Sequence, residues 1–320
     1  MGISQEFIEA IEKGDIHTVQ SLIETLLLSS EPDAQYEIAN MLVQAGYLKE
    51  AEQVLEHLQF LFPEEAQLKI DRAQVLMDID QEDDALLLLT SIEEHADEYP
   101  QALLSLADYY QMQGFYETAE QKINQALALM PSEPVLIFAK AELLLETGKY
   151  LEAVRLYENL KEQTDEIAGI RLSERLAEVY SSGAAYEEAI PYYDESLSHH
   201  VTPDLLFGLA YAAFQAGEYD LAVRKLNEVK TLDPDYFSAH LLLSQAYSML
   251  EDHEQAYSAI VDGLSRDEYD KELYLFAGKM ALKVGNTNDA EAHLRQAIVL
   301  DPEYMEATLT LVSFLHAHER

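Results

Sequence analysis

The sequence contains no cysteine and no tryptophan among its 320 residues. Without cysteine, the chain can form neither a disulfide framework nor a thiolate metal site, and this fits the reducing cytosol. The apolar runs, such as the one near Leu26 to Leu28, are far too short to cross a bilayer. The first residues also lack the basic and apolar segments of a secretory signal. We therefore expect a cytoplasmic protein.

The motifs of common catalytic chemistry are missing as well. The sequence has no glycine-rich phosphate loop, no His-Glu-x-x-His motif and no Gly-x-Ser-x-Gly motif. His199 and His200 are adjacent and His316 and His318 are two apart, so each pair diverges on a helix. We expect no enzymatic activity, no cofactor and no metal site. An enzymatic role would need a catalytic domain that this sequence does not contain.

Basic residues are scarce, with 20 Lys and Arg against 60 Asp and Glu, and the formal net charge is −40. The acidity is densest in residues 1–120, which hold 26 acidic and 4 basic residues. Such a field repels nucleic acid and anionic membranes and attracts cationic partners. A role in solubility explains the same charge equally well.

Small residues recur along the chain at a nearly constant interval. The interval between successive marker alanines is 34 residues, except for one of 36 and one of 33. The marker alanines are Ala51, Ala85, Ala119, Ala153, Ala189, Ala222, Ala256 and Ala290. A small residue stands twelve positions before each marker, and glycine stands five positions before five of them. This phase predicts a repeated unit of two helices joined by a tight turn.

The recurring residues suit close packing of antiparallel helices. Two helices approach closely only where the facing side chains are small, and alanine allows this without the helix penalty of glycine. Glycine supplies the permissive backbone of the turn, and a proline after several of the second helices stops them. One amphipathic pair cannot bury its own apolar face, so neighbouring pairs must stack.

The repeat resembles that of the tetratricopeptide repeat (TPR) family. In residues 100–131 the family pattern reads Ala107, Tyr110, Gly114, Tyr116, Ala119, Ala126 and Pro131. The resemblance implies an all-α, right-handed solenoid of antiparallel helix pairs. It says little about function, because one fold can serve many functions. The acidic composition without cysteine or tryptophan is similar to that of YpiA-like cytosolic TPR proteins of Bacillus-type bacteria.

The repeat register divides the chain into three parts. Residues 1–31 are expected to form a degenerate helix pair, 32–302 eight TPR-type repeats, and 303–320 the terminal helix of an incomplete repeat or a cap. The helix expected over 303–318 has little polar outer face, with Leu311 and Phe314 among its apolar residues. A cap should have such a face. We therefore expect that the natural chain continues or that this edge meets a partner.

The middle of the chain departs from the pattern. The 36-residue interval contains the segment 166–169, and Pro191 falls inside a predicted helix. We expect a local change in the superhelical path there.

The resemblance also implies where a ligand would bind, because the first helix of each TPR unit lines the concave face. The side chains of this face are expected 18, 15, 11 and 8 positions before each marker alanine. The predicted groove consists of Leu104, Asp108, Phe138, Glu142, Leu145, Glu174, Glu178, Asp204, Phe207, Tyr211 and Phe214.

Three large aromatics, Phe207, Tyr211 and Phe214, form one stripe of this groove. They are either apolar anchors for a peptide or ordinary core residues, and the sequence favours neither. Some TPR proteins grip acidic tails with a Lys/Asn/Arg clamp. Here Asn40 matches one clamp position, but Tyr36 stands where the lysine would be. An acidic tail is therefore not the expected ligand.

Two hypotheses of function follow. In the first, the chain is a non-catalytic adaptor that binds a basic, partly apolar protein segment in an acidic, aromatic-lined groove. In the second, it is a structural scaffold or a subunit that self-associates through its C-terminal edge. No nucleic acid and no membrane insertion are expected in either case.

Overall fold

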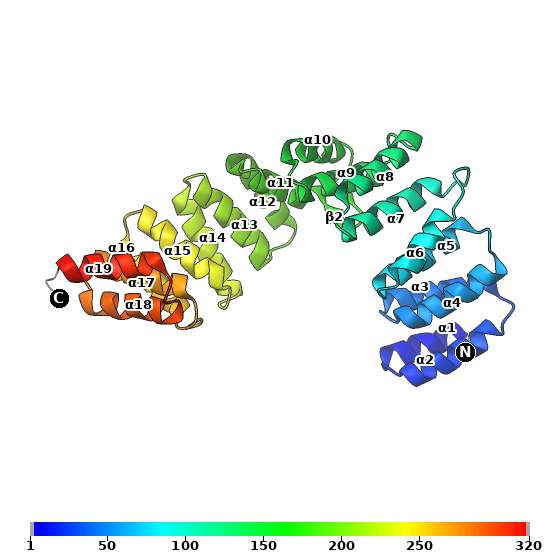
Figure 1. The fold of residues 1–320 in the computed structure, drawn as a ribbon, viewed down its shortest axis with the longest axis horizontal. Helices are drawn as coiled ribbons and strands as arrows, with labels where there is room; N and C mark the ends of the chain where they lie inside the picture. The colour runs from blue at the N-terminus through cyan, green and yellow to red at the C-terminus, as the bar shows by residue number, and fades with distance from the viewer. Residues whose placement is uncertain (1–2, 318–320) are drawn as a thin grey trace. The chain divides into compact units, whose positions relative to one another are not determined.

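The computed structural model describes residues 3–317, which form 19 α-helices and one short β-hairpin. Successive helices pack as hairpin pairs (Figure 1). The helices group into two compact units, Met1–Thr147 and Gly148–Arg320. The all-α fold expected from the repeat is confirmed for the described residues, and its only strands are two residues long each.

Unit 1 consists of four helix pairs followed by one further helix. Each second helix packs on its own first helix, and the first helices α5, α7 and α9 also pack side by side. Its helices are α1 (Ile3–Glu12), α2 (Ile16–Leu27), α3 (Pro32–Gln44), α4 (Leu48–Leu61), α5 (Ala66–Asp78), α6 (Glu82–Thr90), α7 (Tyr99–Met112), α8 (Tyr116–Leu129) and α9 (Pro134–Glu146).

Unit 2 contains the hairpin and ten helices. Four helix pairs, α11 with α12 through α17 with α18, stack in sequence, and α19 packs on α18 and α17. Its elements are α10 (Tyr150–Lys161), β1 (Glu166–Ile167), β2 (Ile170–Arg171), α11 (Leu172–Ser182), α12 (Tyr186–His199), α13 (Pro203–Gln215), α14 (Tyr219–Leu232), α15 (Phe237–Met249), α16 (His253–Leu264), α17 (Lys271–Lys283), α18 (Thr287–Leu300) and α19 (Met305–Ala317).

Within each unit, the marker alanines lie where the paired helices touch. All eight are 0% exposed, and so are the alanine or serine residues twelve positions before seven of them. Ala107 and Ala119, for example, belong to one buried cluster between α7 and α8. In the last complete pair the earlier position is Gly278, where an added Cβ would lie 2.7 Å from the Cγ atom of Leu294. The small residues therefore set how closely the helices approach.

The tight turn inside each pair requires a left-handed backbone. Gly114 has a φ of 74°, and the other four recurring turn glycines have similar values. In the three repeats that lack this glycine, the same position is held by Asp80, Ala184 and Glu251, with φ angles of 60°, 59° and 63°. The turn geometry is thus kept even where the side chain disfavours it.

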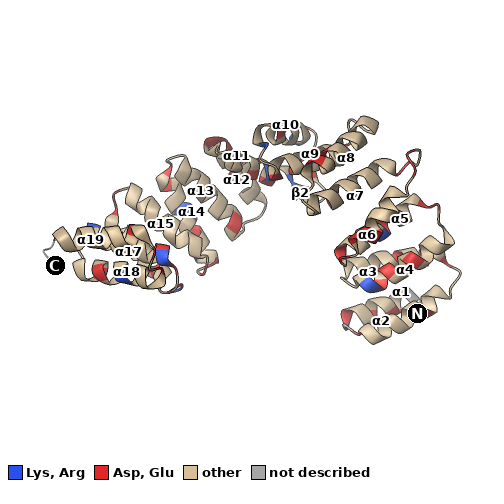
Figure 2. Ribbon diagram, in the orientation of Figure 1, with Lys and Arg blue, Asp and Glu red and all other residues tan. Residues whose placement is uncertain are grey.

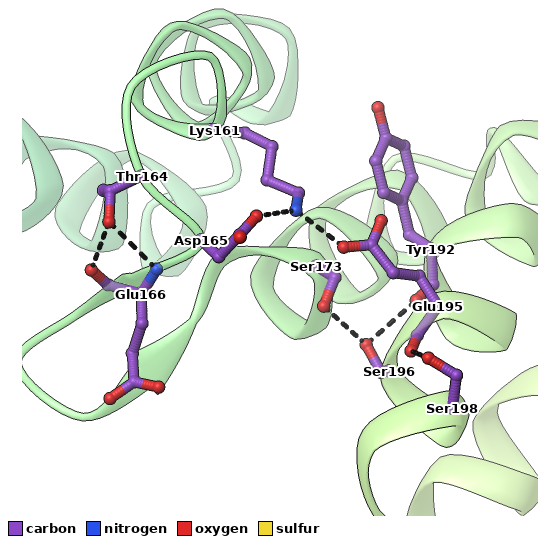
Figure 3. A network of polar contacts seen from close by, with 9 residues as sticks. All are labelled: Lys161, Thr164, Asp165, Glu166, Ser173, Tyr192, Glu195, Ser196 and Ser198. Atoms are coloured by element: carbon purple, nitrogen blue, oxygen red, sulfur yellow. Dashed lines mark hydrogen bonds and ion pairs between the residues drawn. The ribbon is translucent and has the colours of Figure 1, made fainter.

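The two extra residues of the 36-residue interval accompany a β-hairpin, in which Glu166 pairs with Arg171. Lys161 joins this insertion to α12, because its Nζ atom lies 2.6 Å from carboxylate oxygens of both Asp165 and Glu195 (Figure 3). The Ser196 hydroxyl donates to the Tyr192 carbonyl oxygen at 2.9 Å and lies 3.0 Å from the Ser173 hydroxyl, which connects α12 with α11. The expected change in the superhelical path stays a prediction.

The C-terminal helix presents a different face from the one its sequence suggested. Leu311 and Phe314 are 7% and 4% exposed and pack into the core with α18, so they do not form an open edge. The exposed apolar residues of α19 are Met305, Leu309 and Val312, at 69%, 59% and 57%. His318 and the last residues of the expected helix lie outside the described residues.

The alanine in a left-handed turn gives a stability prediction. Replacing Ala184 with glycine should raise the free energy of unfolding by about 1 kcal/mol, because glycine adopts this conformation without steric cost. Part of the gain is offset by the greater freedom of glycine in the unfolded chain. Urea unfolding of Ala184→Gly beside the native protein measures the change.

The matched control is Ala185→Gly at the next residue, where φ is −94° and no such relief is available. A stability of Ala184→Gly equal to that of Ala185→Gly would contradict the assignment of strain to this turn.

Candidate functional site

The predicted groove residues all lie on first helices, but they belong to two units. Leu104 and Asp108 lie on α7, and three others lie on α9 of unit 1. The remaining six lie on α11 and α13 of unit 2. The predicted residues are therefore divided between two candidate faces, called here the unit 1 face and the unit 2 face.

The aromatic stripe of the unit 2 face is built into a larger set of rings. The ring centroid of Phe207 lies 5.0 Å from that of Tyr236, which precedes α15. Phe214 lies 5.5 Å from Tyr219 in an edge-on arrangement. Tyr211 lies 6.0 Å from Tyr186 at an interplanar angle of 80°. Such edge-on and tilted pairs stabilise each ring in one orientation.

The stripe is partly core and partly surface. Phe207 and Phe214 are half-buried and pack against the hydrophobic cluster that includes Leu206 and Leu243. Tyr211 is 38% exposed and is the most open ring of the stripe. Phe207 and Phe214 thus have the packing contacts expected of core residues. Tyr211 has the exposed ring expected of a peptide anchor.

The carboxylates of the unit 2 face are held by neighbouring donors. The Tyr236 hydroxyl donates to Asp204 at 3.0 Å. Burial and this hydrogen bond raise the pKa of Tyr236 to about 12. Arg175 donates to Glu178 at 2.7 Å, and Glu174 lies 3.7 Å from the His200 Nε2 atom. The position of the Asp204 carboxylate is therefore fixed by a neutral donor.

The unit 1 face contains a polar hollow of about 460 Å³ around Asp108. Tyr116 donates to Glu146 at 3.0 Å, and Gln111 also donates to Glu146. The Asp108 side chain is open to solvent on one side, but the protein around it reduces the hydration of its carboxylate. This desolvation raises the pKa of Asp108 to about 6. Asp108 is thus fully charged only above that pH.

Other predicted residues of the unit 1 face are less open than expected. Phe138 is 7% exposed, so its ring belongs to the packed interior and does not line an open groove. A ring of this size gains more free energy from burial than from exposure, by about 1.5–3 kcal/mol. Glu142 and Leu145 are half-buried. Leu104 lines a cavity of about 360 Å³ together with Met130 and Leu136.

The prediction did not include the three ring partners of the stripe, Tyr186, Tyr219 and Tyr236. For Tyr186 a signal was available in the sequence, because tyrosine recurs three positions before the marker alanine at Tyr116, Tyr150, Tyr186 and Tyr219. These tyrosines begin α8, α10, α12 and α14. Tyr236 stands at the register position that Tyr99 and Tyr304 occupy in other repeats, but its contact with Phe207 could be found only from the fold.

Within residues 3–317, no three His, Asp or Glu side chains are grouped so that they could bind a metal ion. None of the described helices combines the length and the apolar character needed to traverse a bilayer.

Comparison with known proteins places the chain among repeat proteins. The model of YpiA-like tetratricopeptide repeats matches residues 111–165, and a general tetratricopeptide repeat model matches residues 175–237. The TPR repeat-containing protein YpiA of Bacillus subtilis is 36% identical over 315 residues, which are 98% of this chain and 74% of that protein. A TPR repeat-containing protein of Methanocaldococcus jannaschii is 29% identical over 38% of this chain and 21% of its own length.

Solved structures show the same fold. The C-terminal part of a TPR repeat-containing protein from Cytophaga hutchinsonii superposes with a TM-score of 0.63 at 16% identity, over 75% of this chain and 98% of that one. The type IV pilus biogenesis factor PilW superposes with a TM-score of 0.53 at 18% identity, over 68% of this chain and all of PilW.

The resemblance that the sequence suggested is therefore confirmed. TPR proteins generally mediate protein–protein or peptide interactions and are typically non-catalytic. The chain belongs to the YpiA-like tetratricopeptide repeat proteins.

Proposed function

We propose that the chain is a non-catalytic adaptor that binds a basic, partly apolar segment of another protein on the faces of its first helices. The observation that supports this best is the unit 2 face, where the exposed ring of Tyr211 lies on α13 with the carboxylate of Asp204. Exposed tyrosine rings are typical anchors at the centres of protein interfaces, and charged groups are typical of the surrounding rim.

The mechanism would be binding to a preorganised surface. The rings of the stripe are held by their tyrosine partners and by the core, so little conformational entropy is lost when a ligand covers them. Tyrosine also offers a large contact area together with a hydroxyl that can hydrogen-bond.

The net charge would act mainly on the rate at which the protein and its ligand associate. Acidic positions lie on helices of both units, whereas basic positions are fewer (Figure 2). A field of one sign steers a cationic segment toward the protein and increases the association rate. The final affinity would then depend on the few groups that the ligand buries.

The adaptor proposal is tested by separating affinity from stability. Tyr211→Ala should weaken binding of a segment captured from the native cytosol by on the order of 2 kcal/mol, with little effect on stability, because its ring is exposed. Phe207→Ala should lower both affinity and stability, since its ring also packs on the core. Titration calorimetry and urea unfolding give the two quantities.

Phe60→Ala is the matched control, because Phe60 is 82% exposed on α4, a second helix outside either face. If Tyr211→Ala bound as tightly as Phe60→Ala, the unit 2 face would not be the binding surface.

A second candidate function is self-association through α19. The observation in its favour is the row of Met305, Leu309 and Val312, which are spaced to lie on one side of that helix and are each more than half exposed. If this row is an interface, the protein should be a dimer or larger in light scattering, and Leu309→Glu should reduce its molar mass to that of the monomer. A native protein that is monomeric at high concentration would exclude this function.

A further inference from the structure

Two cavities of unit 1 repeat each other along the sequence. The first, of about 320 Å³, lies where α3, the end of α4 and the start of α5 meet. The second, of about 360 Å³, lies at the equivalent junction of α7, α8 and α9. Seven of the eight residues that line the first cavity have a counterpart exactly two repeats, or 68 positions, later in the second. The fold has therefore produced the same hollow twice.

Both cavities have an apolar wall and an acidic residue at the same position. Phe62 and Leu68 in the first cavity correspond to Met130 and Leu136 in the second. Glu65 corresponds to Glu133. Asp33 adds a carboxylate to the first cavity and Asp97 and Glu98 add two to the second, and none of the lining residues is Lys or Arg.

In the described part of the chain, the two corresponding glutamates have no cationic partner. Glu65 and Glu133 are the N-cap residues of α5 and α9, yet neither side chain caps its helix. Within residues 3–317, no side chain forms a hydrogen bond or an ion pair with either carboxylate. Each is free to meet a cation at the opening of its cavity.

The repeat junction between the two cavities in the sequence has a different residue at this position. There the position of Glu65 and Glu133 is occupied by Tyr99. Its ring is half-buried and packs against the clusters that contain Leu106 and Leu136. The two acidic cavities are thus two repeats apart, and the junction between them presents a tyrosine at this position.

The chemistry of each cavity suits a lysine or arginine side chain. These side chains bury their aliphatic part along an apolar surface and keep the charged end near water or a carboxylate. A volume of 320–360 Å³ is at the small end of the range for ligand sites, which favours one side chain per cavity.

The spacing of the cavities fixes the spacing of the two side chains. First helices that pack side by side are about 10 Å apart, so two repeats separate equivalent points by roughly 20 Å. An extended chain advances about 3.3 Å per residue and covers this distance in about six residues. We propose that unit 1 binds an extended protein segment through two basic residues about six positions apart, one in each cavity. This inference rests on the proposed adaptor function and specifies its ligand.

The test uses the full chain and synthetic fluorescein-labelled peptides in fluorescence anisotropy. One peptide carries lysines at positions i and i+6 of a Ser/Ala background, a second carries them at i and i+3, and a third has one lysine of the first replaced by norleucine. We expect the first peptide to bind about tenfold more tightly than the other two, because only it fills both cavities at once. Equal affinities of the first two peptides would overturn the proposal.

Variants then assign the effect to the cavities. Glu65→Gln and Glu133→Gln should each remove the preference for the i, i+6 peptide, whereas Glu94→Gln, at an exposed glutamate outside both cavities, should leave it unchanged. Glu133→Tyr copies the residue of the intermediate junction and should close the second cavity while the chain stays folded, as checked by circular dichroism. A preference that survives Glu65→Gln and Glu133→Gln would contradict the inference.

The outcome can be distinguished from failure of the adaptor function itself. If binding of a captured segment depends on Tyr211 but no lysine spacing is preferred, the adaptor function stands and this inference fails. If the spacing preference is found but Tyr211→Ala has no effect, the unit 2 face is rejected and the cavities of unit 1 are supported.

Discussion

The two helices of each repeat pack in close contact, and this contact depends on residues with little or no side chain. A side chain larger than alanine at a marker position would push the paired helices apart, because the interior is packed at the density of a solid. The same constraint holds between neighbouring pairs. Gly208 on α13 would place a Cβ atom 2.6 Å from the ring of Tyr193 on α12. Within the pair of α15 and α16, Gly263 would place one 2.8 Å from the His240 Cβ atom. Because small residues fix these contacts, the rest of each first helix is available for other roles.

A second property of the fold is how it accommodates many carboxylates with few basic partners. Tyrosine hydroxyls donate to carboxylates about one repeat away, as from Tyr36 to Asp71 at 2.6 Å and from Tyr257 to Asp289 at 2.9 Å. Tyr236 makes the same kind of bond to Asp204. Burial, together with this hydrogen bond, raises the pKa of Tyr257 to about 12. A neutral donor orients a carboxylate without cancelling its charge, so the acidic field that would attract a cationic segment is kept.

The fold could be predicted from the sequence because it depends on small residues that recur at a nearly constant interval along the chain. Each marker alanine and its partner twelve positions earlier specify one helix crossing, and the buried positions agree with that register. The turn at Ala184 could be located by the phase, but its left-handed conformation is imposed by the helices on either side. Packing of a whole repeat outweighs the preference of one residue.

The candidate site could be predicted only in part. The spacing of residues along a helix indicates which side chains share a face, but it does not tell how deeply the next helix covers them. Phe138 is buried and Tyr211 is exposed, although both were assigned to the same groove. The inward direction of Leu311 and Phe314 on α19 was missed for the same reason. The cavities at the repeat junctions were missed because each combines residues from three helices.

The most direct measurement of the small-residue constraint is the thermal unfolding of Ala119→Leu compared with Ala128→Leu. Both alanines lie on α8, but Ala119 is fully buried against α7 whereas Ala128 is exposed. If alanine sets the helix crossing, Ala119→Leu loses about 1–3 kcal/mol through overpacking, and Ala128→Leu stays close to the native stability. Equal melting temperatures for the two variants would contradict the assigned register.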